Sequence, residues 1–183
     1  MPTVRTARLN DAQAIARIRV AGWQTAYRGI VADEVLDAMD ATVRPRLRKQ
    51  LTSPMPGQAM MVYESDGEIR GFVNCGPYRI DQDSSRIDAG QGAEIYAIYV
   101  DPRVWREGCG AALMHGAERF LADASFTRCR LWTLEANQRA RRFYAARDYA
   151  WDGARLDYVG FDGTPVPEVR YTKTLNQHCE PQR

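Results

Sequence analysis

The amino-acid sequence predicts a single α/β (α+β) domain in which strands and helices are interleaved. The central observation is one segment, Ala93 to Ala124, in which a strand, a glycine-containing turn and a helix follow one another. Shorter strands and helices, separated by turn residues, lie on both sides of it. The chain has 183 residues, 45% of them hydrophobic, which is enough to bury one core. We expect residues 1–176 to form this domain and residues 177–183 to be a disordered tail.

The first part of the chain predicts a strand followed by three helices. Asn10-Asp11 is placed to cap the first helix, and Gln13 would complete a capping box if Asn10 is the cap. Gly29 marks a break after this helix. We expect the strand at residues 3–7, the first helix from residue 10 onward, and the other two helices at residues 33–39 and 44–51.

The remaining segments are predicted to complete a sheet. Asp66-Gly67 lies between two apolar runs, and this dipeptide is a strong indicator of a β-hairpin. Residues 79–92 are polar and predict a long loop. The other predicted elements are strands at residues 58–64, 69–78, 93–100, 129–134, 149–159 and 166–175, a helix at 138–146 and a turn at 161–165.

The junction between the strand at 93–100 and the helix after it is suited to binding phosphate. Gly108 and Gly110 lie at this junction, where the first N–H groups of the helix lack partners and the helix dipole is positive. Glycine lets an anion approach the backbone, and Arg103 and Arg106 add positive charge. A tight structural turn is the alternative explanation. The spacing fits neither a Rossmann fingerprint nor a P-loop.

Two segments resemble motifs of the GNAT superfamily, the acetyl-CoA-dependent N-acyltransferases. Val100-Asp101-Pro102 and the following run Trp105-Arg106-Glu107-Gly108-Cys109-Gly110-Ala111-Ala112-Leu113-Met114 are similar to its pyrophosphate-binding segment. The pattern there is Gln/Arg-x-x-Gly-x-Gly/Ala, and Trp105 stands at its first position. Asn137-x-x-Ala140-x-x-Phe143-Tyr144-x-x-x-Asp148-Tyr149 resembles Asn-x-x-Ala-x-x-Phe-Tyr-x-x-x-Gly-Phe, with Asp148 at the glycine. From the order and separation of these motifs, the chain is identified as a member of this superfamily.

The resemblance implies a mixed, mostly antiparallel sheet flanked by helices, with its fourth and fifth strands splayed apart. Acetyl-CoA would lie between those strands, with its pantetheine arm paired to the fourth strand and its pyrophosphate over the glycine-containing turn. Asn137 would hydrogen-bond the pantetheine, and capping of the next helix is its alternative role. The implied coenzyme-binding residues are Ile98, Tyr99, Val100, Arg103, Arg106, Glu107, Gly108, Cys109, Gly110, Ala111, Asn137 and Tyr144.

Acyl transfer to an amine requires a base for the amine, a donor for the thioester oxygen and a proton for the leaving thiolate. Tyr144 matches the family's tyrosine that protonates the coenzyme A sulfur. Glu94 is the candidate base, because a carboxylate among apolar residues is a stronger base and because the histone acetyltransferase branch has its catalytic glutamate there. A structural carboxylate at a strand end is the alternative. The oxyanion donor would be a main-chain N–H near Ile98 or Tyr99, and Cys109 is not expected to be a nucleophile.

Contacts with the acceptor are expected from Trp23, Tyr27 and Arg28, because the linker between the first two helices forms a wall of the acceptor pocket in the family. Tyr96 of the central strand is a further candidate. Trp23 and Tyr27 are four residues apart, so packing of one helical face into the core is the alternative. The implied acceptor is a primary amine of a small molecule or of a protein or peptide N-terminus. A non-catalytic acyl-CoA-binding regulator is the competing class.

Composition argues against several other classes of protein. A formal net charge of +2 is too small to indicate nucleic-acid binding. We expect no secretory signal and no membrane span, because no apolar run is long enough. The four cysteines form no C-x-x-C pair and there are only two histidines, so we expect no metal and a reducing cytoplasm. Homodimers are common in the superfamily, and we expect one here.

Overall fold

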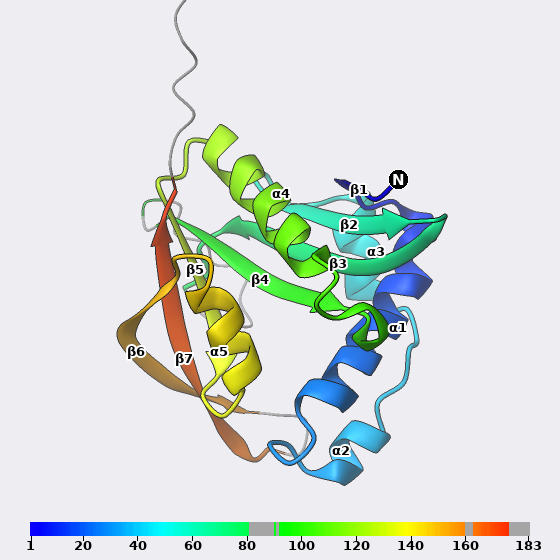
Figure 1. Ribbon diagram of the computed structural model, residues 1–183, viewed down its shortest axis with the longest axis vertical. Helices are drawn as coiled ribbons and strands as arrows, with labels where there is room; N and C mark the ends of the chain where they lie inside the picture. Colours follow the sequence, from blue (N-terminus) through cyan, green and yellow to red (C-terminus); the bar gives the residue numbers. More distant parts are fainter. Residues whose placement is uncertain (81–89, 91, 160–162, 176–183) are drawn as a thin grey trace, which may run out of the picture.

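The computed structural model describes residues 1–80, 90, 92–159 and 163–175 (Figure 1). The predicted strands and helices within these residues are present, and their bounds differ from the predictions by at most two residues. In chain order they are Thr3–Thr6 (β1), Leu9–Asp11 (η1), Ala12–Ala26 (α1), Asp33–Asp37 (α2), Pro45–Thr52 (α3), Ala59–Ser65 (β2), Glu68–Pro77 (β3), Ala93–Val100 (β4), Pro102–Val104 (η3), Cys109–Asp123 (α4), Arg128–Leu134 (β5), Gln138–Ala145 (α5), Ala150–Val159 (β6) and Pro165–Thr174 (β7).

The strands form one seven-stranded sheet in the order β1-β2-β3-β4-β5-β7-β6. Neighbouring strands are antiparallel except β4 and β5, which are parallel. A parallel pair needs a crossover, and α4 supplies it. The parallel pairing covers only Ala93–Ile95 and Cys129–Leu131, after which the two strands diverge (Figure 1). The predicted mixed, mostly antiparallel sheet with splayed fourth and fifth strands is confirmed.

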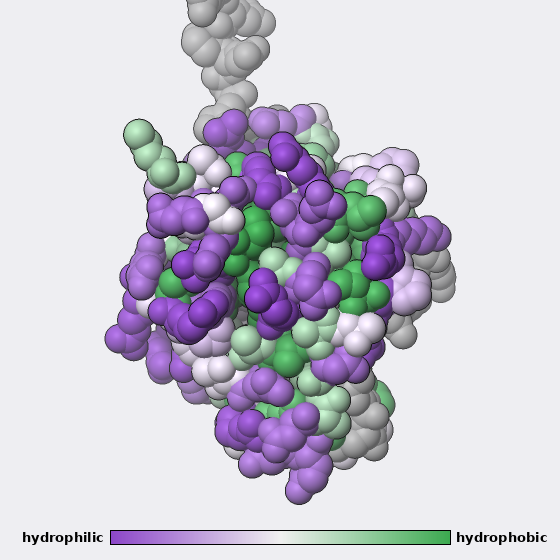
Figure 2. Space-filling model, turned by 90° about the vertical axis from the view of Figure 1, so that its right-hand side faces the viewer, coloured by the Kyte–Doolittle hydropathy of each residue, from purple (hydrophilic) through white to green (hydrophobic). Residues whose placement is uncertain are grey.

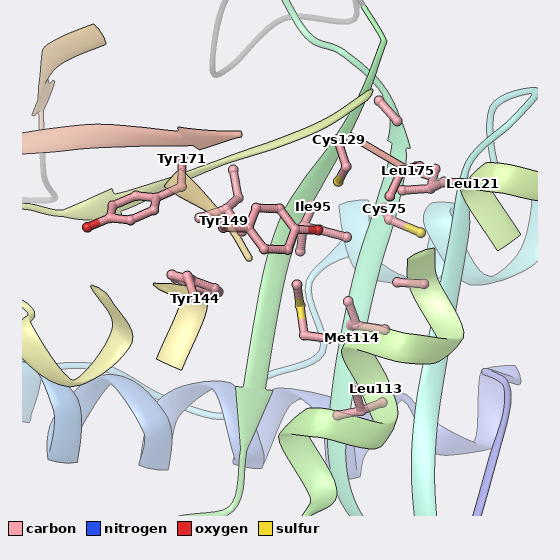
Figure 3. Close-up of a cluster of buried hydrophobic side chains, with 14 of the residues drawn as sticks. Cys75, Ile95, Leu113, Met114, Leu121, Cys129, Tyr144, Tyr149, Tyr171 and Leu175 are labelled. Carbon is pink, nitrogen blue, oxygen red and sulfur yellow. The ribbon is translucent and has the colours of Figure 1, made fainter. Parts of the chain in front are cut away.

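Helices cover both faces of the sheet. On one face α4 packs Leu113, Ala117 and Leu121 against the strands, and Figure 3 shows this core with Met114 and three tyrosines around it. On the other face α1 packs Ile15 and Ile18 against β2 and β3. Strand residues alternate between the two cores, as the period of a β-strand requires. We refer to these as the α4 face and the α1 face.

Helix α1 begins differently from the prediction. Asn10 lies inside the 3-10 turn η1, and the carboxylate of Asp11 accepts the N–H of Arg8 at 2.7 Å. The guanidinium of Arg5 donates two hydrogen bonds, at 2.8 and 3.0 Å, to the same carboxylate. Gln13 instead donates to the carbonyl of Ala41 at 3.1 Å. Asp11 of the predicted Asn10-Asp11 pair is therefore the N-cap residue of α1, and the capping box that Gln13 would have formed with Asn10 is not made, because Gln13 is engaged by Ala41.

The predicted hairpin is present between β2 and β3. Asp66 has a φ of 53° and Gly67 a φ of 77°, the two positive values that a type I′ turn requires. The middle of the loop at 79–92, the start of the turn at 161–165 and the tail at 177–183 lie outside the described residues. Within the part of the chain that the structure describes, no helix has the length and apolar character needed to cross a membrane.

Candidate active site

The splay between β4 and β5 begins at a β-bulge in β4. Ile95 and Ala97 pair with the consecutive residues Cys75 and Asn74 of β3, so Tyr96 is the extra residue of the bulge. A bulge bends its strand and increases the twist, which accounts for the departure of β4 from β5. Beyond the bulge, residues 97–100 pair with β3 on one side only. Their other edge carries backbone N–H and C=O groups that an extended ligand can pair with, and the predicted Ile98, Tyr99 and Val100 lie along this edge.

The turn before α4 has backbone geometry suited to binding an anion. Gly108 has a φ of 84° and Arg106 a φ of 73°. Nothing lies within 4 Å of the position where a Cβ of Gly108 would be, so a bulky anion can approach its backbone. The intrahelical hydrogen bonds begin with Ala112 N–H to Gly108 C=O, so the amides of Cys109, Gly110 and Ala111 belong to the first turn. Arg106, Glu107 and Gly108 are exposed.

Packing explains why the two residues after Gly108 are a cysteine and, at position 110, a glycine. A Cβ on Gly110 would lie 3.1 Å from the Phe143 ring, so glycine allows α5 to pack against the start of α4. Cys109 is 2% exposed, and burial raises the pKa of its thiol to about 12. A thiol that keeps its proton at neutral pH is a poor nucleophile. Gly110 and Cys109 can therefore offer backbone N–H groups to a ligand but not side-chain chemistry.

Trp105, at the position of the family's Gln or Arg, has two contacts that hold the turn. Its indole N–H donates to the carbonyl of Val100 at 2.9 Å, which closes the end of β4. The guanidinium of Arg139, on α5, lies 3.8 Å from the centroid of its ring. The contact brings a positive charge from α5 to the turn. Sequence reasoning missed Arg139, because the two residues are far apart along the chain.

Arg103 is directed away from the turn. Its side chain pairs with Asp101 at 2.6 Å and is 75% exposed. It also lines a hollow of about 610 Å³ between α1, β1 and the β2–β3 hairpin. Figure 2 views the molecule from this side and shows hydrophilic side chains over most of it. The charges of this hollow largely pair with one another, as in the contacts of Arg5 with Asp11 and Glu64 at 2.8 and 2.6 Å, so we assign it a structural role.

Helix α5 is positioned at both of its ends by residues of the second motif. The side-chain oxygen of Asn137 accepts the N–H of Ala140 at 3.1 Å, so Asn137 caps the helix. Asp148 has a φ of 64°, the left-handed conformation for which the family uses glycine. Aspartate tolerates this conformation better than most residues, which explains how the motif keeps its geometry without glycine.

Tyr144 is the buried phenol of this helix. It is 8% exposed, and its ring centroid lies 6.3 Å from that of Tyr149 and 6.2 Å from that of Tyr171 (Figure 3). Burial raises its pKa above the usual value, and the negative charge of Glu168 raises it further. Tyr144 therefore stays protonated at neutral pH, which is the state a proton donor needs.

Glu94 lies in the paired part of β4 and not in the splay. It is 2% exposed, and Arg79 occupies both of its oxygens. The backbone N–H and Nε of Arg79 donate to one oxygen at 3.0 and 3.2 Å, and Nη2 donates to the other at 2.5 Å. The same guanidinium lies 4.4 Å from the ring centroid of Tyr96, whose hydroxyl donates to Pro77 C=O at 2.6 Å. Sequence reasoning missed Arg79, which lies at the start of the polar loop.

The end of α1 meets the splayed part of β4 through aromatic side chains. The indole N–H of Trp23 donates to the hydroxyl of Tyr99 at 2.7 Å, and Tyr27 hydrogen-bonds the same hydroxyl. The Trp23 and Tyr27 rings are in edge-to-face contact at 4.8 Å. A Cβ on Gly22 would lie 2.9 Å from the Tyr99 ring, so glycine allows this approach. Burial raises the pKa of Tyr27 and Tyr99.

Arg28 does not join this aromatic group. Its side chain is exposed and pairs with Asp33 at 3.1 Å and with Asp37 at 2.8 Å, which ties the end of α1 to α2. The structure therefore brings together Trp23, Tyr27, Tyr99 and Tyr144 around the splay, and it places Arg28, Arg103 and Glu94 in ion pairs outside it.

No group of three or more His, Cys, Asp or Glu side chains in the described part of the chain could hold a metal ion.

Comparison with known proteins agrees with this geometry. A model of the acetyltransferase (GNAT) family matches residues 23–149. Over 182 residues the chain is 29% identical to the uncharacterized N-acetyltransferase YuaI of Bacillus subtilis, a match that covers 96% of this chain and 98% of YuaI. The structure of YncA from Salmonella typhimurium, with acetyl-CoA, has a TM-score of 0.72 at 20% identity and covers 100% of this chain and 98% of that one.

A second solved structure is similar in fold. The PaiA N-acetyltransferase of Thermoplasma acidophilum, in complex with coenzyme A, has a TM-score of 0.66 at 16% identity and covers 95% of this chain and 99% of that one. The fold and the family match together define an acyltransferase. Since the family model spans most of the chain, the protein belongs to the GNAT family of acetyltransferases and is an N-acetyltransferase.

Proposed function

We propose that the protein transfers an acetyl group from acetyl-CoA to a primary amine of a small molecule or of a peptide or protein N-terminus. The observation that carries this proposal is the open backbone edge of residues 97–100 of β4, which ends beside the glycine-containing turn before α4, where a Cβ on Gly110 would lie 3.6 Å from Val100. The relatives named as N-acetyltransferases and the two neighbours with acetyl-CoA or coenzyme A support it.

The coenzyme would be held mainly by backbone. The pantetheine would pair with residues 98–100 of β4, and the pyrophosphate would accept N–H groups of residues 106–111, next to the positive end of α4. The Trp105–Arg139 pair supplies a cation close to this turn. Asn137 caps α5 with its oxygen, so its amide N–H₂ can still serve as a donor.

The chemistry is direct transfer with both reactants held side by side. The proposed base Glu94 takes the proton of the amine as its nitrogen attacks the thioester carbon, a β4 N–H stabilises the thioester oxygen, and the carbon–sulfur bond breaks. Tyr144 gives its phenolic proton to the departing sulfur. The raised pKa of Tyr144 keeps that proton available at neutral pH.

Glu94 remains our proposed base, and a pair of variants tests it. The carboxylate must first give up a contact with Arg79. We expect Glu94→Gln to lower kcat by about 100-fold or more with little change in acetyl-CoA affinity. Because breaking the buried pair costs about 3–5 kcal/mol of stability whichever partner is replaced, Arg79→Gln is the matched control. Equal kcat values for the two variants at a temperature where both are folded would assign Glu94 a structural role.

We favour a small amine over a macromolecule as the acceptor, because a net charge of +2 indicates no strongly charged surface for a macromolecule to bind.

We also propose a cytoplasmic enzyme that forms a homodimer. The buried free thiols Cys75, Cys109 and Cys129 fit a reducing compartment. The competing function is an acyl-CoA sensor without catalysis, which would share the coenzyme site but would not need the phenol of Tyr144.

Calorimetry with acetyl-CoA, followed by thiol release with a panel of amines, amino acids, polyamines and aminoglycosides, tests the proposal. We expect binding in the micromolar range and thiol release with one class of acceptor. Binding without release for every member of the panel would favour the sensor or a protein acceptor. If acetyl-CoA does not bind, the proposed function is wrong.

A further inference from the structure

Trp132 of β5 differs from the other tryptophans of the chain in the state of its indole N–H. The indole N–H groups of Trp23, Trp105 and Trp151 donate hydrogen bonds at 2.7, 2.9 and 3.3 Å. Among the residues that the structure describes, none accepts the N–H of Trp132, whose side chain is half-buried. A tryptophan that is largely removed from water normally has a partner for its N–H, so this donor is available to a ligand.

Sheet register places Trp132 at the start of the splay. Ile95 and Leu131 form the last pair between β4 and β5. Trp132 is therefore the first residue of β5 without a partner on β4, and its partner on the other side is Arg170 of β7. The edge of β5 at Trp132 faces the gap in which acetyl-CoA is proposed to lie.

Trp132 lies on the same face of the sheet as the proposed base Glu94. Arg130 is the partner of Glu94 in the register, and paired residues of neighbouring strands share a face. Trp132 is two residues beyond Arg130, so it returns to that face about 7 Å further along the strand. Leu131, between them, belongs to the core on the α4 face, as does Tyr144. Trp132 and Glu94 are therefore on the α1 face, opposite Tyr144.

A cation from β7 holds the indole ring of Trp132. Cζ of Arg170 lies 5.5 Å from the ring centroid. Arg170 itself donates to the hydroxyl of Tyr78 and to the carboxylate of Asp152, both at 2.8 Å. Because these contacts fix the guanidinium, the ring is positioned before a ligand arrives, which lowers the entropy cost of binding.

We propose that the indole N–H of Trp132 donates a hydrogen bond to an oxygen next to the acceptor amine, and that the acceptor is an α-amino acid or the α-amino end of a peptide. The inference rests on the proposed function, because acetyl-CoA along β4 and the base Glu94 define where the amine lies. In an α-aminoacyl group two carbon atoms separate the amine nitrogen from the oxygen. Such a group, with a hydrogen bond of about 2.9 Å at each end, covers the ~7 Å between the levels of Glu94 and Trp132 in the sheet.

This contact would select among amines. An alkyl amine or a polyamine has no oxygen at this position and would leave the N–H of Trp132 without a partner when it displaces water. A site built to hydrogen-bond an oxygen discriminates against an analogue that lacks it, because the unpaired donor is costly. The acceptor's side chain plays no part in the contact, so the test can use the simplest α-aminoacyl group.

Three bisubstrate conjugates of coenzyme A provide this test. In each, a methylene and a carbonyl carbon link the sulfur to the nitrogen of glycine, glycinamide or isobutylamine, which have the same shape. Calorimetry on the full-length protein should show the glycine conjugate, the glycinamide conjugate or both binding at least about five-fold more tightly than the isobutylamine conjugate. A preference for the carboxylate indicates an amino acid as acceptor, and a preference for the neutral carbonyl indicates a peptide.

The variant Trp132→Phe keeps an aromatic ring beside Arg170 and removes the N–H. In this variant we expect the three affinities to agree within about two-fold, with that for the isobutylamine conjugate unchanged. Trp151→Phe is the matched control, because it removes an indole N–H that donates to Ala154 within β6. It should keep the preference of the unsubstituted protein.

A spectroscopic measurement does not depend on the stability of Trp132→Phe. The indole N–H resonance of Trp132 in isotope-labelled, unsubstituted protein can be assigned by elimination with Trp23→Phe, Trp105→Phe and Trp151→Phe. A new hydrogen bond should move this resonance downfield with the preferred conjugate and not with the isobutylamine conjugate. Identical shifts with the two conjugates would contradict the inference.

The results separate this inference from the proposed function. Equal binding of the three conjugates by the unsubstituted protein, or an unchanged preference in Trp132→Phe, would overturn the role of Trp132. Loss of the preference in Trp151→Phe as well would show that the effect is not specific to Trp132 and would also overturn it. Failure of the unsubstituted protein to bind acetyl-CoA or any conjugate would reject the coenzyme site and the proposed function with it.

Discussion

Tyr144→Phe should lower kcat by about 100- to 1,000-fold while the Kd for acetyl-CoA changes by less than about two-fold. The substitution removes one hydroxyl and keeps the ring contacts with Phe143, Tyr149 and Tyr171. The variant can no longer donate a proton to the departing sulfur, an interaction that stabilises only the transition state. Thiol release under saturating acetyl-CoA, together with calorimetry, measures the two quantities separately.

Tyr171→Phe is the matched control for this prediction. Its ring lies in the same buried cluster, and its hydroxyl accepts a hydrogen bond from Arg141 at 3.1 Å (Figure 3). We expect it to cost about 1 kcal/mol of stability and to leave kcat nearly unchanged. If Tyr144→Phe is as active as Tyr171→Phe, Tyr144 is not the proton donor.

The raised pKa of Tyr144 also has a consequence for stability. The usual pKa is 10.0, and burial raises it in the folded state. Below pH 10 Tyr144 holds its proton in both the folded and the unfolded protein, so burial of the neutral phenol does not lower the free energy of unfolding. As the pH rises above 10 the unfolded chain loses this proton first, so the free energy of unfolding falls. Tyr144→Phe should reduce that alkaline loss in a comparison of chemical denaturation at neutral pH and above pH 10.

Gly108→Trp should weaken acetyl-CoA binding by at least about 100-fold and leave the domain folded. The indole would occupy the space beside the turn, which is open within 4 Å of the Cβ position, and would keep the pyrophosphate from the backbone N–H groups. The φ of 84° also makes a side chain at this position cost about 1–2 kcal/mol. Calorimetry measures the affinity, and thermal unfolding measures the cost in stability.

Gly67→Trp provides the comparison for backbone strain. Gly67 has a φ of 77° and open space around its Cβ position, but it lies in the β2–β3 hairpin. The two variants should lose similar stability, and only Gly108→Trp should lose affinity for acetyl-CoA. Full affinity in Gly108→Trp would mean that the phosphate site lies elsewhere.

Local sequence patterns were enough to predict the elements and the family. Alternation and turn residues predicted the strands and the Asp66-Gly67 hairpin, because these features depend on residues a few positions apart. The two motifs predicted the splayed sheet, which the three-residue pairing of β4 with β5 confirms. The roles of the individual site residues remain predictions, and the variants above test them.

Other predictions depended on contacts that spacing does not reveal. Of the expected Asn10-Asp11 cap, Asp11 is the N-cap residue, and the capping box with Gln13 is not formed because Gln13 donates to Ala41, 28 residues away. The partner of Glu94 is Arg79, and the guanidinium of Arg139 lies over the ring of Trp105. In each pair the two residues are too far apart along the chain for a local sequence pattern to predict the contact.

The sequence by itself determined where helices and strands form, where a glycine leaves the turn before α4 open, and which tyrosine occupies the family's position. Each of these follows from the residue and its close neighbours in the chain. Only the tertiary structure decided that the candidate base Glu94 is held in an ion pair with Arg79. That outcome depends on sheet order and register, which place Glu94 in the paired part of β4 and against Arg79. A one-residue change in that register would move Glu94 to the other face of the sheet.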